Sequence, residues 1–405
     1  MTQSFSEPVS LYCHFPFCVH RCAYCDFNTY AGQLDVVPAY VQSLCNEIKA
    51  VGNSASSKVK VQTIFFGGGT PSLLAASQFE SILQTTEQNF DVLPNAEISL
   101  EANPGTCSFD YLKSLRSLGL NRISFGVQSA NPDELHLLER LHSYSDVIDA
   151  VKWSRQSGFD NINLDLIYGL PEQTLKRWEN TLTQVLGLHP EHLSLYALTL
   201  EPGTPFGRWA RSGLLPIPDP DLAADMYELA GETLTGAGYE QYEISNWSLR
   251  GRQCRHNLQY WRNQPYLGLG AGAHGFVGGY RYSNVLRIKT YINRLEEYLS
   301  EGNLYPLTPA TVNHHKNTLR DDMQETMMTG LRLTHEGISE NSFRERFQVS
   351  LTDVYGKDIN ELMDLGLLEW KNENKSENEK SGRLIRLSKR GLLLGNQVFM
   401  RFVGE

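Results

Sequence analysis

Short apolar segments alternate with longer amphipathic ones over the first half of the chain, and this alternation restricts the fold more than any other feature. The short segments are rich in β-branched and aromatic residues, which favour strands. The longer ones have helix boundaries: Ser108 and Ser145 precede two of them, and Gly119 and Gly158 follow. Strands that alternate with helices form a parallel sheet, often closed into a barrel. We therefore predict an α/β fold, a partial (β/α)6 TIM-like barrel, with strands at residues 9–15, 59–66, 96–101, 121–128, 161–168 and 192–199.

Polar residues stand at the ends of four of these predicted strands. The run Gly67-Gly68-Gly69-Thr70-Pro71 follows the second strand, Glu101 and Gln128 end the third and fourth, and Asp165 lies near the end of the fifth. In parallel barrels the C-terminal strand ends share one face and form the site. Any one of these residues alone is best interpreted as an ordinary loop residue, but their repetition favours a site. The glycine run is neither a dinucleotide-binding nor a Walker motif, although consecutive glycines let a ligand approach the backbone.

Three cysteines follow the first predicted strand with the spacing Cys-x3-Cys-x2-Cys: Cys18, Cys22 and Cys25. Thiolates this close in sequence can hold a soft metal or an iron–sulfur cluster. A structural zinc ion is the alternative, but such zinc prefers four ligands, often as two Cys-x2-Cys pairs, and only one such pair is present. We predict a [4Fe–4S] cluster, in which three protein ligands would leave one iron open to another group.

Composition limits the class of protein. The 405 residues carry a net charge of −10, which argues against broad nucleic-acid binding. We expect no transmembrane segment and no secretory signal, because no apolar run is long enough and the N-terminus lacks a basic and an apolar region. The seven cysteines are an odd number and unevenly spaced, so we expect free thiols and a cytoplasmic location rather than a disulfide framework.

The pattern changes after residue 200, and we predict three regions. Residues 1–240 form the barrel with its cluster site, residues 241–305 form a linking region, and residues 306–405 form a small C-terminal domain. A strand is expected at 239–247 and a helix at 288–300. In the last region, helices at 319–333, 339–347 and 353–365 precede a strand pair and a final helix, an order typical of a winged-helix-like domain. Residues 371–382 are charged and low in complexity, and we expect them to form a solvated loop.

Taken together, the motifs resemble those of the radical S-adenosylmethionine (SAM) superfamily. The resemblance rests on Tyr12-x-His-Phe-Pro-Phe-Cys-x3-Cys-x2-Cys, the Gly-Gly-Gly-Thr-Pro run, Gly126-Val-Gln-Ser, and Asp165-Leu-Ile-Tyr-Gly-Leu-Pro171. It extends over nearly the whole chain. Within the superfamily, the chain is similar to the branch that contains the oxygen-independent coproporphyrinogen III oxidases and the HemW heme chaperones, the latter being the nearer group.

This resemblance implies a set of site residues. The cluster would be held by Cys18, Cys22 and Cys25, and its open iron would be bound by the amino and carboxylate groups of SAM. Arg140 would pair with a carboxylate, although it lies in a predicted helical run, where an arginine is usually a surface residue. The residues expected to contact SAM are Tyr12, Gly68, Gly69, Thr70, Glu101, Gln128, Arg140 and Asp165.

Two features separate the branches. The oxidases carry a further cysteine two places after the third, where this chain has Phe27. The run Cys254-Arg-His256-Asn257-Leu-Gln-Tyr260-Trp261 matches the His-Asn-x-x-Tyr-Trp motif that the resemblance associates with heme binding, with His256 as a heme ligand. From residue types alone, His256 is better interpreted as a hydrogen-bonded loop histidine, with Tyr260 and Trp261 in the core, and only the resemblance favours the heme ligand.

The resemblance therefore implies a heme chaperone that transfers heme to an acceptor hemoprotein, with a [4Fe–4S] cluster, SAM and an electron donor. It is compatible with a homodimer. The alternative is an enzyme of the same fold, a coproporphyrinogen III oxidase that makes protoporphyrinogen IX by decarboxylation. Phe27 and the heme motif favour the chaperone.

Overall fold

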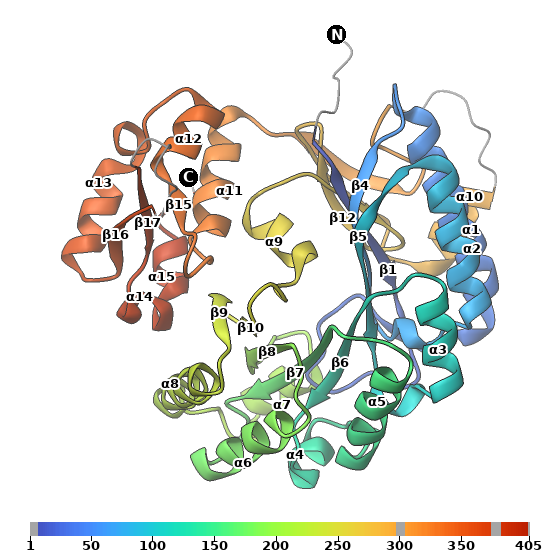
Figure 1. Ribbon diagram of the computed structural model, residues 1–405, viewed down its shortest axis with the longest axis horizontal. Coiled ribbons are helices and arrows are strands. Elements are labelled where there is room, and N and C mark those ends of the chain that lie inside the picture. The colour runs from blue at the N-terminus through green and yellow to red at the C-terminus, as the bar shows by residue number, and fades with distance from the viewer. Residues whose placement is uncertain (1–6, 297–303, 374–381, 404–405) are drawn as a thin grey trace. The chain divides into compact units, whose positions relative to one another are not determined.

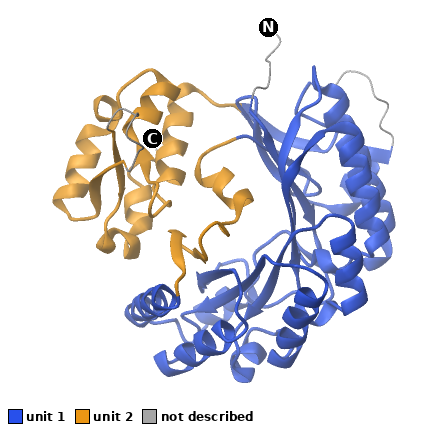
Figure 2. Ribbon diagram, viewed as in Figure 1, with its two compact units in different colours: residues 1–237, 265–315 blue, residues 238–264, 316–405 orange. Residues whose placement is uncertain are grey.

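The computed structural model describes residues 7–296, 304–373 and 382–403. The chain divides into two compact units (Figure 2): residues 1–237 with 265–315, and residues 238–264 with 316–405. Residues 241–305, expected as one linking region, are shared between the two units.

The first unit is built on the predicted parallel sheet. Its parallel strands lie in the order β1-β4-β5-β6-β7-β8, and helices run along one side of the sheet (Figure 1). This arrangement confirms the α/β fold and all six predicted strands. The strands are β1 (Val9–Phe15), β4 (Lys60–Gly68), β5 (Asp91–Ala102), β6 (Arg122–Gln128), β7 (Ile162–Tyr168) and β8 (His192–Ala197).

The helices between the strands also follow the predicted order, with one boundary that differs. Helix α5 begins at Tyr144, and the residue before it is Ser143 rather than Ser145. The backbone N–H and the hydroxyl of Ser143 both donate to the Asp146 carboxylate at 2.7 Å, so the cap forms two residues earlier than predicted. The α-helices of this part are α1 (Val37–Ser54), α2 (Ala76–Asn89), α3 (Phe109–Ser117), α4 (Pro132–Leu137), α5 (Tyr144–Gln156), α6 (Leu175–Leu186), α7 (Pro205–Arg211) and α8 (Pro220–Gly236), with short 3-10 helices at Leu34–Val36, Pro71–Leu73 and Pro104–Thr106.

Later strands extend the sheet on the other side of β1. Strand β11 (Tyr266–Leu269) pairs with β1 in parallel, and β12 (His274–Val277), β13 (Tyr280–Asn284) and β14 (Thr311–Lys316) continue the sheet. This pairing explains why residues 265–315 belong to the first unit. Helix α10 (Ile288–Glu296) matches the predicted helix up to residue 296, and the rest of that prediction lies outside the described residues.

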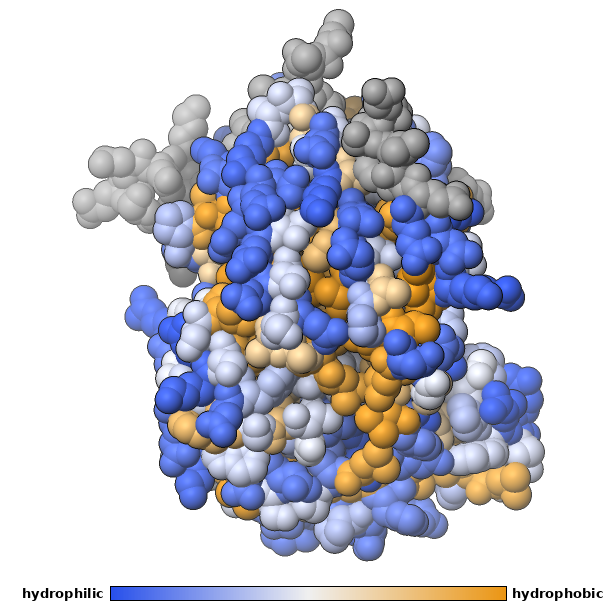
Figure 3. All heavy atoms as spheres, turned by 90° about the vertical axis from the view of Figure 1, so that its right-hand side faces the viewer, coloured by the Kyte–Doolittle hydropathy of each residue, from blue (hydrophilic) through white to orange (hydrophobic). Residues whose placement is uncertain are grey.

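Figure 3 shows one face of the molecule. Hydrophilic side chains cover much of it, and apolar ones are visible near its middle. Over the described residues, no helix is long and apolar enough to cross a membrane.

The second unit contains a hairpin and a winged-helix-like domain. Strands β9 (Glu240–Glu243) and β10 (Asn246–Ser248) pair antiparallel, so the single strand predicted at 239–247 is wrong, because the chain turns back after Glu243. Helix α9 (Arg255–Trp261) follows. The domain then runs through α11 (Leu319–Gly330), β15 (Ile338–Ser339), α12 (Glu340–Phe347), α13 (Leu351–Asp364), β16 (Leu368–Asn372) and β17 (Arg383–Leu387).

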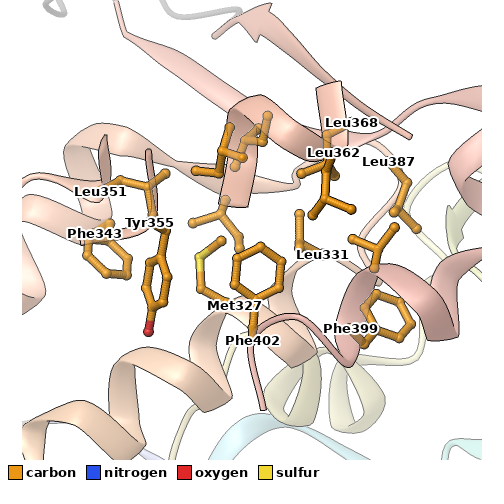
Figure 4. Packing of buried hydrophobic residues seen from close by; sticks show 14 of the residues in the cluster. Met327, Leu331, Phe343, Leu351, Tyr355, Leu362, Leu368, Leu387, Phe399 and Phe402 are labelled. Carbon is orange, nitrogen blue, oxygen red and sulfur yellow. The ribbon is translucent and has the colours of Figure 1, made fainter. Parts of the chain in front are cut away.

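The winged-helix-like domain has its own apolar core. Its three strands form a sheet in the order β15-β17-β16, and buried side chains such as Met327, Phe343 and Phe402 fill the space between sheet and helices (Figure 4). The final predicted helix is two short ones, α14 (Lys389–Leu393) and α15 (Gly395–Phe399). Most of the charged loop predicted at 371–382 lies outside the described residues.

Candidate functional site

The three cysteines lie on the loop that follows β1. Cys18 belongs to the short strand β2 (Phe17–Cys18), which pairs in parallel with β3 (Tyr30–Ala31). Cys18 is buried, Cys22 and Cys25 are half-buried, and all three are free thiols. Burial raises the pKa of Cys18 and of Cys25, and the neighbouring cysteines add to that shift. The loop therefore holds three free thiols, two of which have raised pKa values.

Each sulfur atom has a polar neighbour. The Thr70 hydroxyl donates to Cys18 Sγ at 3.7 Å, and Arg140 Nη1 donates to Cys22 Sγ at 3.7 Å. Cys25 Sγ and the Thr29 hydroxyl are 4.0 Å apart. Hydrogen-bond donors around sulfur stabilise thiolates and tune the clusters that thiolates hold.

This donor set has the chemistry of a cluster site, because cysteine thiolates are the usual protein ligands of iron–sulfur clusters. Three free thiols with hydrogen-bond donors beside them suit that group.

The glycine run packs directly against the cysteine loop. The N–H of Gly69 donates to the Phe15 carbonyl at 2.7 Å, and that of Thr70 donates to the Phe17 carbonyl at 2.8 Å. A Cβ on Gly69 would lie 2.5 Å from the Phe17 carbonyl oxygen and 3.0 Å from Cys18 Sγ. A larger side chain would therefore displace the backbone that carries Cys18.

Glu101, on β5, is joined to the same turn. The Gly68 N–H donates to Glu101 Oε2 at 3.0 Å, in a backbone conformation with φ of 116° that favours glycine. Burial, together with the nearby charge of Asp165, raises the pKa of Glu101 to about 7. Tyr12 also lies close to Gly67: a Cβ at Gly67 would be 3.0 Å from the Tyr12 ring and 3.1 Å from Glu101 Oε2.

His14 belongs to the Tyr12-x-His-Phe-Pro motif, but no role was expected for it. Its Nε2 lies 3.0 Å from the Asn28 carbonyl, and its Nδ1 lies 3.0 Å from the Tyr12 hydroxyl. A carbonyl only accepts, so Nε2 carries the proton and Nδ1 accepts from Tyr12. His14 thus ties β1 to the chain just after the cysteines. Its place two residues after Tyr12 on the same strand was the available signal.

Gln128 and Arg140 meet over Gly126. A Cβ on Gly126 would lie 2.8 Å from Gln128 Nε2 and 3.3 Å from Arg140 Nη2. Arg140 is not helical, contrary to expectation, because α4 ends at Leu137 and Glu139 turns the chain with φ of 52°. Its guanidinium donates to the Gly126 carbonyl at 2.9 Å as well as to Cys22. The arginine thus bridges the end of β6 and the cysteine loop.

Asp165, on β7, accepts hydrogen bonds from neighbouring polar side chains, Ser194 among them. The Ser124 hydroxyl donates to Oδ2 and the Asn163 amide to Oδ1, both at 2.8 Å. Burial raises the pKa of Asp165, while these hydrogen bonds oppose the shift. The first unit therefore brings the cysteines and the eight residues expected to contact SAM into one series of neighbouring groups.

The predicted heme motif belongs to the second unit. His256, on α9, is only 1% exposed, and its Nε2 lies 2.8 Å from the Tyr260 hydroxyl, with the two rings perpendicular. The Arg332 guanidinium lies 4.4 Å from the centre of the Trp261 ring. The N–H of the buried Cys254 donates to the Tyr242 hydroxyl at 3.3 Å. A heme iron bound at His256 Nε2 would have to replace the contact with Tyr260.

Two models of known protein families match this chain, one within each of its two units. The model of the radical SAM superfamily matches residues 12–185, and that of the HemN C-terminal domain matches residues 317–376. The heme chaperone HemW of Bacillus subtilis is 38% identical over 98% of this chain and 99% of its own length. That of Escherichia coli is 44% identical over 67% of this chain and 70% of its own length. The mouse mitochondrial radical S-adenosyl methionine domain-containing protein 1 is 36% identical over 90% of this chain and 83% of its own length.

A solved structure supports the fold. The coproporphyrinogen III oxidase HemN of Escherichia coli, a radical SAM enzyme, superposes with a TM-score of 0.80 at 25% sequence identity. The superposition covers 98% of this chain and 90% of that one.

Proposed function

The chain belongs to the HemW family of heme chaperones within the radical SAM superfamily, and from this premise we propose that it binds heme and passes it to an acceptor hemoprotein. The observation that carries the proposal is the similarity to Bacillus subtilis HemW over 98% of this chain and 99% of that protein. Both the barrel and the C-terminal domain are included, so the similarity is not limited to a shared cofactor module.

We propose that Cys18, Cys22 and Cys25 hold a [4Fe–4S] cluster beside a SAM site. When bound, the cluster supplies an electron and an open iron. Glu101 offers a carboxylate oxygen to the amino group of SAM, and Asp165 offers one to the ribose hydroxyls. The Gly68–Gly69 backbone admits the ligand closely, and Tyr12, Thr70, Gln128 and Arg140 complete the surroundings. The support is a set of contacts among these groups in the first unit: Thr70 with Cys18, Arg140 with Cys22, and Gly68 with Glu101.

For heme itself we propose His256 as the ligand. An imidazole nitrogen is a common axial ligand of heme iron. Because His256 is buried against Tyr260, binding requires α9 to release that contact. The heme titration below tests this assignment.

The competing function is coproporphyrinogen III oxidation, favoured by the fold shared with HemN. Anaerobically reconstituted protein, incubated with SAM, a reductant and coproporphyrinogen, separates the two. We expect no protoporphyrinogen, and its formation would overturn the chaperone as sole function.

Heme titration followed at the Soret band then tests the site. We expect the spectrum of His256→Ala to differ from that of the wild type and that of His335→Ala, an exposed histidine of the same unit, to match it. Identical spectra for all three proteins would remove His256 as a ligand.

The remaining assignments are also proposals. An acceptor hemoprotein and an electron donor are required by the function, and a homodimer is compatible with it. A cytoplasmic location suits a chain whose seven cysteines are all free thiols.

A further inference from the structure

A chain of buried polar side chains leads from β8 to Asp165. His192 Nδ1 lies 2.6 Å from Asn163 Oδ1, and the Ser194 hydroxyl donates to the same oxygen at 3.2 Å. The Asn163 amide nitrogen donates to Asp165 Oδ1 at 2.8 Å and to the Ser124 hydroxyl at 2.7 Å. His192 is fully buried and Asn163 is 2% exposed, so these contacts form without competition from bulk water.

The direction of each hydrogen bond in this chain is fixed by chemistry. The NH2 group of Asn163 donates both to Asp165 Oδ1 and to the Ser124 hydroxyl, so it faces these two groups. The oxygen of Asn163 then faces β8, where it accepts from the Ser194 hydroxyl and from His192. His192 Nδ1 must therefore carry a proton.

His192 is held in its neutral form. Burial lowers its pKa well below the usual value, and the charge of the buried Arg122 adds to the effect. A neutral imidazole with its proton on Nδ1 acts as a single donor to Asn163. Rotating the Asn163 amide by half a turn would turn its NH2 group toward the Nδ1–H of His192 and its oxygen toward Asp165, so both of these hydrogen bonds would be lost.

We propose that His192 is a positioning residue for the ribose of SAM. It fixes the orientation of the Asn163 amide, and that amide together with Ser124 fixes the Asp165 carboxylate. Asp165 is the group assigned above to the ribose hydroxyls, so this inference rests on the proposed SAM site. The simpler alternative is that His192 only fills the barrel interior. In that case its loss would weaken all ligands equally.

The test compares ligands that differ only in the ribose. Anaerobically reconstituted wild type, His192→Leu and His192→Asn are titrated with S-adenosylhomocysteine and with its 2′-deoxy and 3′-deoxy analogues, with binding measured by calorimetry. Asn can place an N–H near the position of His Nδ1, whereas Leu cannot donate. Ser10→Ala is the matched control, since it removes a buried β1 hydroxyl that has no hydrogen-bond partner in the structure.

We expect the wild type, His192→Asn and Ser10→Ala to prefer the full ribose to at least one deoxy analogue by about tenfold. In His192→Leu the preference should fall to about twofold or less. Undiminished preference in a folded His192→Leu protein, or equal loss in His192→Leu and His192→Asn, would overturn the role of His192. A wild type that binds S-adenosylhomocysteine without any ribose preference would instead overturn the role of Asp165, and with it this inference.

Discussion

The backbone N–H of Gly68 and the carboxylate of Glu101 are joined by a hydrogen bond of 3.0 Å. The contact connects the turn after β4 to the end of β5, and through Gly69 it connects Glu101 to the backbone that carries Cys18. A carboxylate in this position is shielded from water and close to Asp165, and both conditions favour its protonated form.

This environment predicts a pH-dependent stability. The pKa of Glu101 is about 7 in the folded protein against 4.5 for the ordinary group. Between pH 4.5 and pH 7, the folded state therefore keeps a proton on Glu101 that the unfolded state has lost. The free energy of unfolding should therefore fall as pH rises from about 4.5 to 7. Above about pH 7 the folded protein should bear the full cost of ionising Glu101. Glu101→Gln removes the titration, and at pH 8 it should be more stable by on the order of 1–3 kcal/mol.

Thermal melting of the apo protein at pH 5 and pH 8 measures this effect. The difference in melting temperature between Glu101→Gln and the wild type should grow with pH. Glu87→Gln, an exposed position on α2, should show no such growth. A constant difference for Glu101→Gln would mean that Glu101 is ionised across the whole range.

Gly69→Ala should cost the protein its cluster. The added Cβ would meet the Phe17 carbonyl at 2.5 Å and Cys18 Sγ at 3.0 Å, and a carbonyl in a paired strand cannot yield as the end of a flexible side chain can. We expect a loss of stability of about 1–3 kcal/mol and a lower iron content after reconstitution. Gly203→Ala is the control, since nothing lies within 4 Å of its Cβ. Equal iron content in both variants would show that the loop adapts.

Arg140→Lys should weaken SAM binding while leaving the cluster in place. The guanidinium reaches both the Gly126 carbonyl and Cys22 Sγ, and a single ammonium group cannot span the two in the same way. We expect a SAM affinity about tenfold lower, with iron content unchanged. Arg177→Lys, an exposed arginine on α6 paired with Asp133, should bind SAM normally. Unchanged affinity in Arg140→Lys would limit Arg140 to a structural role.

The parallel strands and the polar residues at their ends could be predicted from the sequence because both depend on local patterns. Glu101 stands near the end of β5, and parallel strands bring their C-terminal ends to one face. Asp165 lies in the middle of β7 rather than near its end, as the sequence had suggested. The contacts of Arg140 could not be predicted, because they depend on the left-handed turn at Glu139, a conformation that few residues other than glycine adopt. The hairpin at β9 and β10 was missed because its turn, Ile244-Ser245, contains neither Gly nor Pro, so residues 239–247 resemble one continuous strand. His192 and Asn163 carry no motif at all, and only the pairing of β7 with β8 brings them together.

Tyr260→Phe should strengthen heme binding at His256. In the free protein His256 Nε2 contacts the Tyr260 hydroxyl at 2.8 Å, and a heme iron must replace that hydrogen bond. Removing the hydroxyl lowers this cost, so we expect the heme affinity to rise by about fivefold. Heme titration at the Soret band measures the change, with Tyr355→Phe as the control for loss of a hydroxyl elsewhere in the second unit. The double variant with His256→Ala should lose the gain, since the gain depends on the freed imidazole. A fall in affinity for Tyr260→Phe would indicate that the tyrosine hydroxyl itself contacts bound heme.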